Sequence, residues 1–66
     1  MEPKVGMTVN YNTGNDQPHA AIIAYVYPDG ICNLMVIDPN GANYNKMHVP
    51  QGSGLYQWDY QEVKVG

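Results

Sequence analysis

The side chains able to act as nucleophiles are few, and none stands in a catalytic pattern. The candidates are Cys32, Ser53, Thr8 and Thr13. Cys32 alternates with Leu34 and Val36, a spacing that predicts a buried structural thiol on one face of a strand. Ser53 lies between two glycines but lacks the strand-turn-helix context of a nucleophile elbow. A hydrolase needs a nucleophile with a base and an orienting group, so we expect no catalytic residue.

Paired carboxylates and metal ligands are also missing as patterns. Asp29 and Asp38 lie in proline-containing turns, where aspartate hydrogen-bonds its own backbone. Asp59 and Glu62 are near in sequence, but acid/base work needs a cleft that 66 residues scarcely form. The possible metal ligands His19, His48, Asp16 and Asp38 match no zinc or calcium spacing. We therefore expect no metal, no cofactor and no enzyme, and keep an oligomeric enzyme with its site on a symmetry axis as the alternative.

An aromatic and amide-rich set in the second half of the chain is the best candidate for binding. Tyr56, Trp58 and Tyr60 would share one face of a strand, and such a face can stack a base, pack a peptide or seal an interface. Trp58 as core or interface filler is the competing interpretation. The predicted ligand-binding residues are Tyr44, Lys46, His48, Tyr56, Trp58 and Tyr60.

The charge balance argues against nucleic acid and membranes as partners. Three lysines, no arginine and six acidic residues give a net charge of −3. Duplex binding draws much of its affinity from lysine and arginine on phosphates, and anionic membranes attract the same side chains. The N-terminal residues lack the basic and apolar regions of a signal peptide, and residues 20–27, the longest apolar run, are too short to cross a bilayer. A cytosolic protein with a reduced thiol is expected.

The elements that position these residues read as short strands. Turn residues recur every eight to twelve positions, which is typical of a small sandwich or barrel. Proline, aspartate, asparagine and glycine predict tight turns at residues 28–30 and 38–41. The last predicted element is a fifth strand or a short 3₁₀ turn. The expected strands cover residues 7–11, 19–27, 31–37, 42–49 and 55–60.

Five short strands joined mostly by hairpins predict one all-β domain over residues 1–66. Closure into a small five-stranded SH3-like barrel or closed meander removes exposed edges, and an open meander stacked on a symmetry mate is the alternative. So small a chain has a thin stability margin, and its lone cysteine excludes an internal disulfide. The expected third strand is apolar on both faces, with Ile31, Met35 and Ile37 opposite Cys32. We therefore expect a covered outer face and a homo-oligomer.

Three segments carry a resemblance to a known group of proteins. They are QPHAAIIAYV at 17–26, PDGICNLMVIDPNG at 28–41 and VPQG at 49–52, followed by the late Trp58. Together they resemble small tailed-phage proteins, over about two thirds of the chain. The chain departs from that pattern with Cys32 where valine is usual and Ile37 where phenylalanine is usual. The resemblance implies a phage origin and a compact SH3-like β fold, and it supplies no catalytic residues.

Two functions from different classes remain open. The first is a binding protein in the host cytoplasm, acting in counter-defence by sequestering a small nucleotide signal or by blocking a host protein. Its weak point is charge, because few cations are present to meet phosphates. The second is a minor virion component, whose apolar β surface joins a larger assembly.

Overall fold

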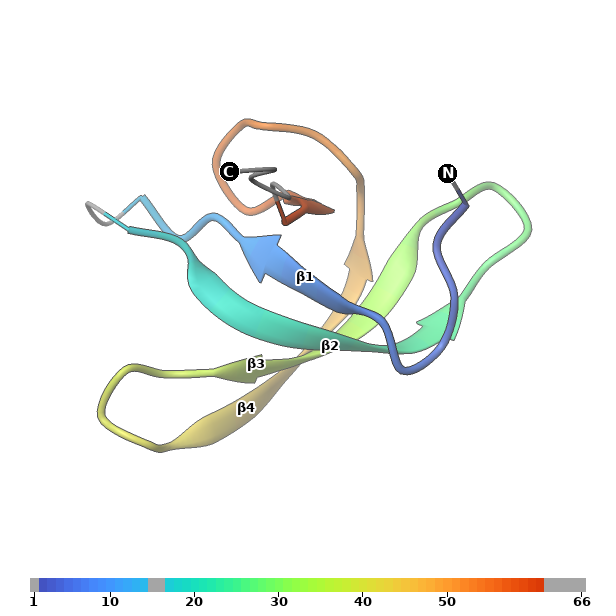
Figure 1. Cartoon of the computed structure of the whole chain (residues 1–66). Coiled ribbons are helices and arrows are strands. Elements are labelled where there is room, and N and C mark those ends of the chain that lie inside the picture. Colours follow the sequence, from blue (N-terminus) through green and yellow to red (C-terminus); the bar gives the residue numbers. More distant parts are fainter. Residues whose placement is uncertain (1, 15–16, 62–66) are drawn as a thin grey trace, which may run out of the picture.

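The computed structural model describes residues 2–14 and 17–61, which form one sheet of five antiparallel strands (Figure 1). The strands lie side by side in the order β4-β3-β2-β1-β5. The all-β prediction is confirmed, and the four hairpin-forming segments are close to their expected bounds. The strands are β1 (Thr8–Tyr11), β2 (His19–Val26), β3 (Cys32–Ile37), β4 (Asn43–Val49) and β5 (Trp58–Tyr60).

Alternation along the strands decides which face is buried. Every second side chain is buried in β3 and in β2 from His19 to Ile23, and Val9 and Tyr11 of β1 are buried on the same side. The cross-strand pairs Val9↔Ala21 and Ala21↔Val36 place these residues in one layer. The core consists of Val9, Tyr11, Ala21, Ile23, Cys32, Leu34, Val36, Val49 and Trp58.

Two hairpin turns of the same geometry connect β2 to β3 and β3 to β4. In the first, Gly30 N donates to Tyr27 O at 2.9 Å, and in the second Gly41 N donates to Asp38 O at 2.8 Å. Both glycines have positive φ, 87° and 94°, a region where a side chain is strained. Asp38 Oδ1 also accepts the Asn40 amide at 3.1 Å. The Pro-Asp-Gly and Pro-Asn-Gly triplets therefore form the turns that they predict.

The segment between β4 and β5 returns across the end of the sheet. Gly52 N donates to Trp58 O at 2.8 Å and Trp58 N donates to Pro50 O at 3.1 Å, around a parallel bridge between Gln51 and Trp58. The fifth strand is shorter than expected, because strand pairing begins only at Trp58. The described sheet is not closed into a barrel. Despite these contacts, β4 and β5 remain at its two edges.

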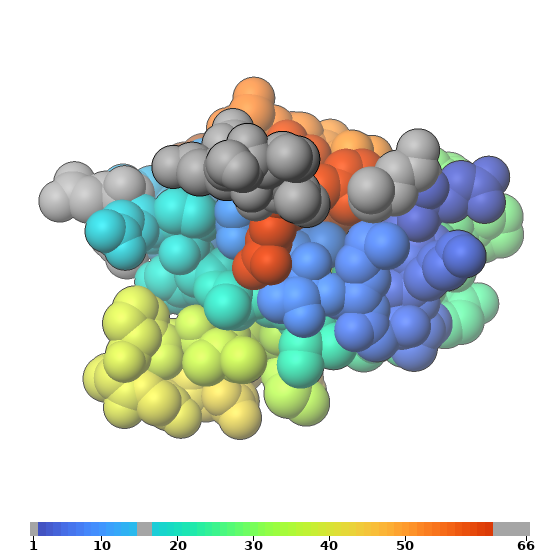
Figure 2. All heavy atoms as spheres, viewed as in Figure 1, coloured from blue at the N-terminus to red at the C-terminus, as the bar shows by residue number. Residues whose placement is uncertain are grey.

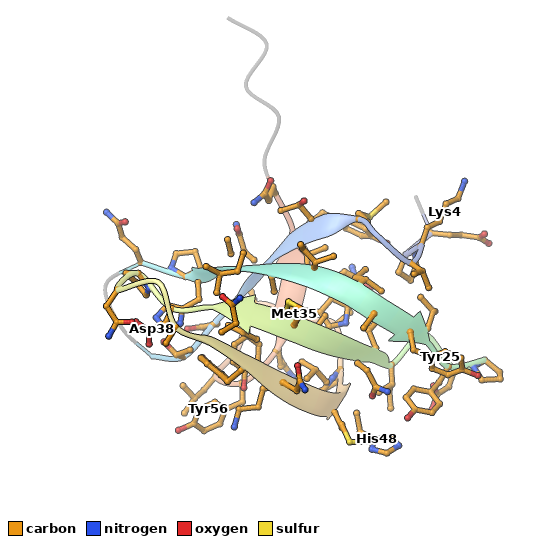
Figure 3. All side chains as sticks on the ribbon, turned by 90° about the horizontal axis from the view of Figure 1, so that it is seen from below. Lys4, Tyr25, Met35, Asp38, His48 and Tyr56 are labelled. Carbon is orange, nitrogen blue, oxygen red and sulfur yellow. The ribbon has the colours of Figure 1, made fainter. Side chains whose placement is uncertain are left out.

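The two faces of the sheet differ in what they carry. Trp58 fills the inner side and is completely buried. The outer face leaves Ile22, Met35 and Ile37 partly exposed, and Figure 3 views the sheet from below, with Met35 near its middle. In the space-filling view the β3–β4 hairpin projects below the first strands (Figure 2). Within the described residues no helix has the length and apolar character needed to span a membrane.

Candidate functional site

The structure distributes the six predicted binding residues over three places. Tyr44, Lys46 and Tyr56 belong to one patch at the end of the sheet, His48 belongs to the opposite end, and Trp58 and Tyr60 lie at the core and its margin. Asp38 and Tyr56 are seen at one end of the sheet, and Tyr25 and His48 at the other (Figure 3). One continuous face is therefore not formed.

The first place is a tyrosine patch, which we define as Tyr11, His19, Tyr44, Lys46 and Tyr56. Tyr11 and His19 are cross-strand partners of β1 and β2. His19 Nδ1 and the Tyr44 hydroxyl are hydrogen-bonded at 3.2 Å, with the two rings edge to face. Lys46 Nζ lies 5.9 Å from the centre of the Tyr44 ring, within cation–π range. The phenol ring of Tyr44 is thus held between an imidazole and an ammonium group.

Tyr56 projects from the return segment in a strained conformation. Its φ is 59°, a value that a bulky residue rarely adopts, and 59% of its surface is exposed. Tyr56 N donates to Asn12 O at 2.7 Å, and Asn12 N donates to Gln57 O at 2.9 Å. The Asn12 side-chain amide also donates to Ser53 O and Gly54 O. Asn12 therefore anchors the segment that presents Tyr56 to solvent.

The phenols of Tyr11 and Tyr44 have raised pKa values and remain protonated at neutral pH. Burial raises the pKa of Tyr11, and the neighbouring Tyr44 and Tyr56 raise it further. Burial and then the nearby Asp38 carboxylate raise the pKa of Tyr44. A phenol has one O–H to donate, and the Tyr44 hydroxyl already shares a hydrogen bond with His19 Nδ1, whereas the Lys46 side chain has three donors. The patch is therefore suited to a ligand that offers acceptor oxygens.

His48 lies in a separate aromatic cluster near the β2–β3 turn. Its ring stacks on Tyr27 with 4.6 Å between centroids, and Tyr25 packs edge-on against Tyr27. The backbone of His48 has a φ of 54°, and its amide donates to Asn33 Oδ1 at 3.0 Å. The strand pairing of β3 with β4 is irregular here, which explains why His48 does not continue the alternation from Tyr44 and Lys46.

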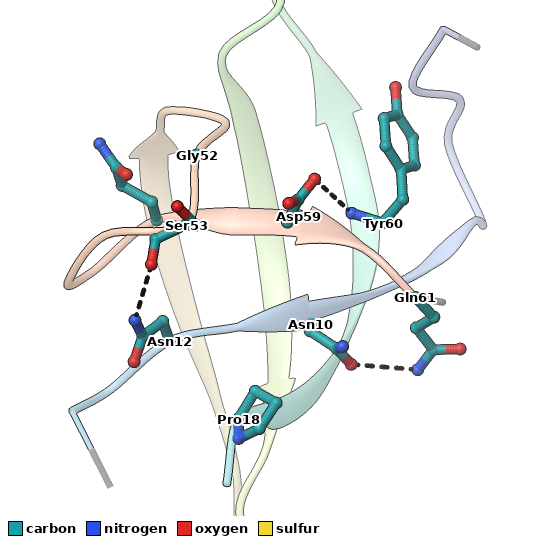
Figure 4. Close-up of a pocket in the computed structure, with 9 residues that line it drawn as sticks. Asn10, Asn12, Pro18, Gly52, Ser53, Asp59, Tyr60 and Gln61 are labelled. Carbon is teal, nitrogen blue, oxygen red and sulfur yellow. Dashed lines mark hydrogen bonds between the residues drawn. The ribbon is translucent and has the colours of Figure 1, made fainter. Parts of the chain in front are cut away.

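Trp58 and Tyr60 also lie away from the tyrosine patch. Trp58 is fully buried and presents no ring face to a ligand, so the core interpretation describes it. Tyr60 packs edge-on against Trp58 at 5.2 Å and borders a polar groove of about 570 Å³ (Figure 4). Among the described residues that line this groove, Asp59 alone is charged. Its lining residues are Asn10, Asn12, Pro18, Gly52, Ser53, Gln57, Asp59, Tyr60 and Gln61.

The remaining reactive groups carry no site in the part of the chain that is described. Residues 2–14 and 17–61 contain no group of three or more histidine, cysteine or acidic side chains placed to hold a metal. Cys32 is buried, its thiol donates weakly to Gly30 O at 3.5 Å, and burial raises its pKa. A thiol held in its protonated form is a poor nucleophile. Asp16 and Glu62, considered from sequence, lie outside the described residues.

Sequence reasoning missed Tyr11 and His19 as members of the patch. Tyr11 is 2% exposed and belongs to the core, as the two-residue alternation of residues 7–11 indicates, whereas His19, expected at the surface or an interface, is buried at 7% exposure. The sequence indicates that Tyr11 and His19 are neighbours, because a hairpin that joins the strands ending at Tyr11 and beginning at His19 pairs these two residues directly. No protein-family model, curated protein or solved structure matches this chain. The function has to be inferred from the residues of the chain itself.

Proposed function

We propose that this chain is a small non-catalytic binding protein of phage origin, which acts in the host cytoplasm by sequestering a small nucleotide-like ligand at the tyrosine patch. The observation that carries the proposal is Tyr56, an exposed aromatic residue held at positive φ, which shares Tyr11 as a neighbour with Tyr44. Strained residues of this kind persist where the surrounding structure enforces them, and they gather at ligand sites. The phage origin rests on the resemblance of residues 17–58.

The chemistry of the patch favours a nucleotide-like ligand over a neutral one. An exposed tyrosine ring can stack on any nucleobase, because every base has a π face. The Lys46 ammonium is a donor for phosphate oxygens, and the Tyr44 phenol is a second donor when His19 Nδ1 carries its proton and donates to the phenol oxygen. Lys46 is the single cation of the patch and Asp38 lies close to Tyr44, which limits the ligand to few phosphates. Longer nucleic acid, which needs several cations along its backbone, is not the expected ligand.

The strand order also supports an SH3-like barrel as the scaffold. In the order β4-β3-β2-β1-β5 the two terminal strands of the sheet are β4 and β5. The return segment between them pairs with β5 through Gly52 and Trp58. Closure by this segment would give a barrel whose rim carries the tyrosine patch.

Calorimetry against a panel of cyclic di- and trinucleotides and ADP-ribose derivatives tests the proposal. Binding is expected to weaken at least tenfold in Tyr56→Ala and in Lys46→Gln. Tyr25→Ala is the matched control, because Tyr25 is similarly exposed and lies at the other end of the sheet. Absence of heat with every ligand of the panel would overturn the nucleotide proposal. Capture of a host protein that depends on Tyr56 would show instead that the patch binds a protein.

A minor virion component is the second candidate function. The partly exposed Met35, Ile37 and Ile22 on the outer face favour it, because assembly proteins bury such surfaces against neighbours. Mass spectrometry of purified virions decides between the two. Detection at a fixed copy number supports the assembly role, and absence removes it.

A further inference from the structure

We propose that the polar groove beside β5 is a second binding site, which takes a neutral saccharide through amide and carboxylate side chains. The groove has a volume of about 570 Å³, within the range of roughly 300–1,000 Å³ that is usual for small-ligand sites. Its lining comes from β1, from the return segment and from β5 (Figure 4). The described lining includes no residue of the tyrosine patch, so the inference does not rest on the nucleotide proposal.

The charge of the groove disfavours anions and metal ions. Asp59 carries the charge of the described lining, to which lysine, arginine and histidine contribute no side chain. A phosphate or carboxylate ligand would therefore meet a like charge and no opposite one. Residues 2–14 and 17–61 also hold no group of three or more histidine, cysteine or acidic side chains that could bind a metal. The groove thus suits an uncharged ligand or an amine, and its hydrogen-bonding groups decide between these two.

Open donors and open acceptors both line the groove. Asn10 Nδ2 and Gln57 Nε2 are donors that have no partner within the described chain. Asp59 Oδ2 and Gln61 Oε1 are acceptors in the same condition. An ammonium group only donates and would leave both amide donors unused, whereas a hydroxyl donates one hydrogen bond and accepts two. Neighbouring hydroxyls of a sugar therefore match the amides and the carboxylate together.

The wall of the groove is fixed by contacts within the chain. Gln57 Oε1 accepts Gly54 N at 2.8 Å, and a Cβ atom at Gly52 or Gly54 would collide with the Gln57 amide. The Asn12 side chain donates to Ser53 O at 3.3 Å and to Gly54 O at 3.1 Å. Glycine at these two positions therefore leaves the space that the Gln57 side chain occupies. Because this side chain is already ordered, binding a ligand costs less conformational entropy.

A nucleobase also offers donors and acceptors, but the groove gives it no ring to stack on. Asn10 and Asp59 are cross-strand partners on β1 and β5. Alternation along β5 places Trp58 and Tyr60 on the opposite side from Asp59. The Tyr60 ring packs edge-on against Trp58, and Figure 4 shows it directed away from Asn10. A saccharide, which binds through its hydroxyls, is therefore favoured over a base in this groove.

Proton–nitrogen NMR titration with glucose, galactose, mannose, N-acetylglucosamine and maltose tests the inference. Concentrations up to about 50 mM reach dissociation constants in the millimolar range. At least one sugar is expected to shift the side-chain amide signals of Asn10 and Gln57. Gln57→Glu keeps an acceptor for Gly54 N but removes the Nε2 donor, and it should raise the dissociation constant by about fivefold or more, as should Asp59→Ala.

The matched control is Asn45→Ala, because Asn45 is an exposed amide on β4 and lies outside the groove. It should bind the sugar as tightly as the unmodified chain. Circular dichroism and backbone amide shifts check that each variant is folded. The affinity should also be the same at about 0.05 M and about 0.5 M sodium chloride, because salt screens only interactions between charges.

Four results would overturn the inference. They are no shift with any of the sugars, shifts that lie outside the groove, unchanged affinity in Gln57→Glu and Asp59→Ala, and equal weakening in Asn45→Ala. Ethylamine is the competing probe. Shifts at Asn10 and Asp59 that ethylamine produces, that no sugar produces and that added salt abolishes would assign the groove to amines instead.

Discussion

Trp58 offers the sharpest test of the core, because its ring is buried and its indole N–H has no hydrogen-bond partner in the described part of the chain. The side chain is completely inaccessible to solvent. Its Nε1 atom finds no hydrogen-bond acceptor among the described residues. Two effects of opposite sign therefore act at one residue. Truncation to alanine removes the packing, whereas replacement by phenylalanine removes the unpaired donor together with a small part of the ring.

The two substitutions are expected to differ severalfold in cost. Trp58→Ala should lower the free energy of unfolding by about 3–5 kcal/mol, the usual range for a buried tryptophan. A domain of this length has roughly 3–10 kcal/mol in total, so this variant is close to unfolding. Trp58→Phe removes about two ring carbons, worth about 1.6 kcal/mol. It also removes an unsatisfied donor that costs about 1–3 kcal/mol. We expect it to lie within about 1 kcal/mol of the original chain.

Urea unfolding followed by far-ultraviolet circular dichroism measures both variants, and equal m-values validate the comparison. Tyr60→Phe serves as a control, because Tyr60 packs on Trp58 and the substitution preserves its ring. If Trp58→Phe costs about 3 kcal/mol or more, the reasoning fails: the indole N–H is then hydrogen-bonded in solution, or the shape of the whole ring is essential to the core.

Further predictions address the turns, the thiol and the anchor of the return segment. Gly41→Ala should destabilise the chain by about 1–2 kcal/mol, because φ is 94° and no atom lies near the added Cβ, and Gly41→Asn should cost less in the same urea titration. Cys32 should resist iodoacetamide in the native state at neutral pH and react once unfolded, as intact-mass measurement would show; native alkylation would contradict its burial. Burial raises the pKa of Cys32 and Tyr11 above ordinary values of 9.0 and 10.0, so the folded chain holds these protons longer. Stability should therefore be insensitive to these groups below about pH 9 and should fall above it, with Cys32→Val delaying the onset; a rise in stability would refute the shifts. Asn12→Ala should increase amide exchange across residues 53–57, because Asn12 Nδ2 donates to Ser53 O and Gly54 O, and unchanged exchange would show that the segment is held otherwise.

The strands and turns were predictable because local chemistry dominates them. Alternation in β3 places Cys32, Leu34 and Val36 in the core, as a two-residue period requires. The glycine of each turn adopts the positive φ that the triplet predicts. Closure into a barrel, which the described sheet does not show, was not predictable in the same way, because it depends on how β4 and β5 meet, and these consecutive strands are joined by an irregular segment.

The candidate site was only partly predictable, because the fifth strand begins later than its sequence pattern suggests. Alternation over residues 55–60 put Tyr56, Trp58 and Tyr60 on one face. The backbone instead turns at Tyr56, where φ is positive, and pairs with β1 from Trp58 onward. A one-residue backbone irregularity thus separates an exposed ring from a buried one. The irregular pairing near His48 separates it from Tyr44 and Lys46 in the same manner.

The small size of the chain explains why Trp58 is buried in the core while Tyr56 is exposed. Sixty-six residues without a disulfide bury a small core, and the largest side chain available is needed inside it. With Trp58 committed to the core, ring stacking on a ligand falls to a smaller aromatic residue on the rim. Tyr56 occupies that position at a backbone angle that glycine would adopt without strain. A Tyr56→Gly variant should therefore fold with nearly unchanged stability and lose its ligand. A large loss of stability instead would make Tyr56 a structural residue and move the binding site elsewhere.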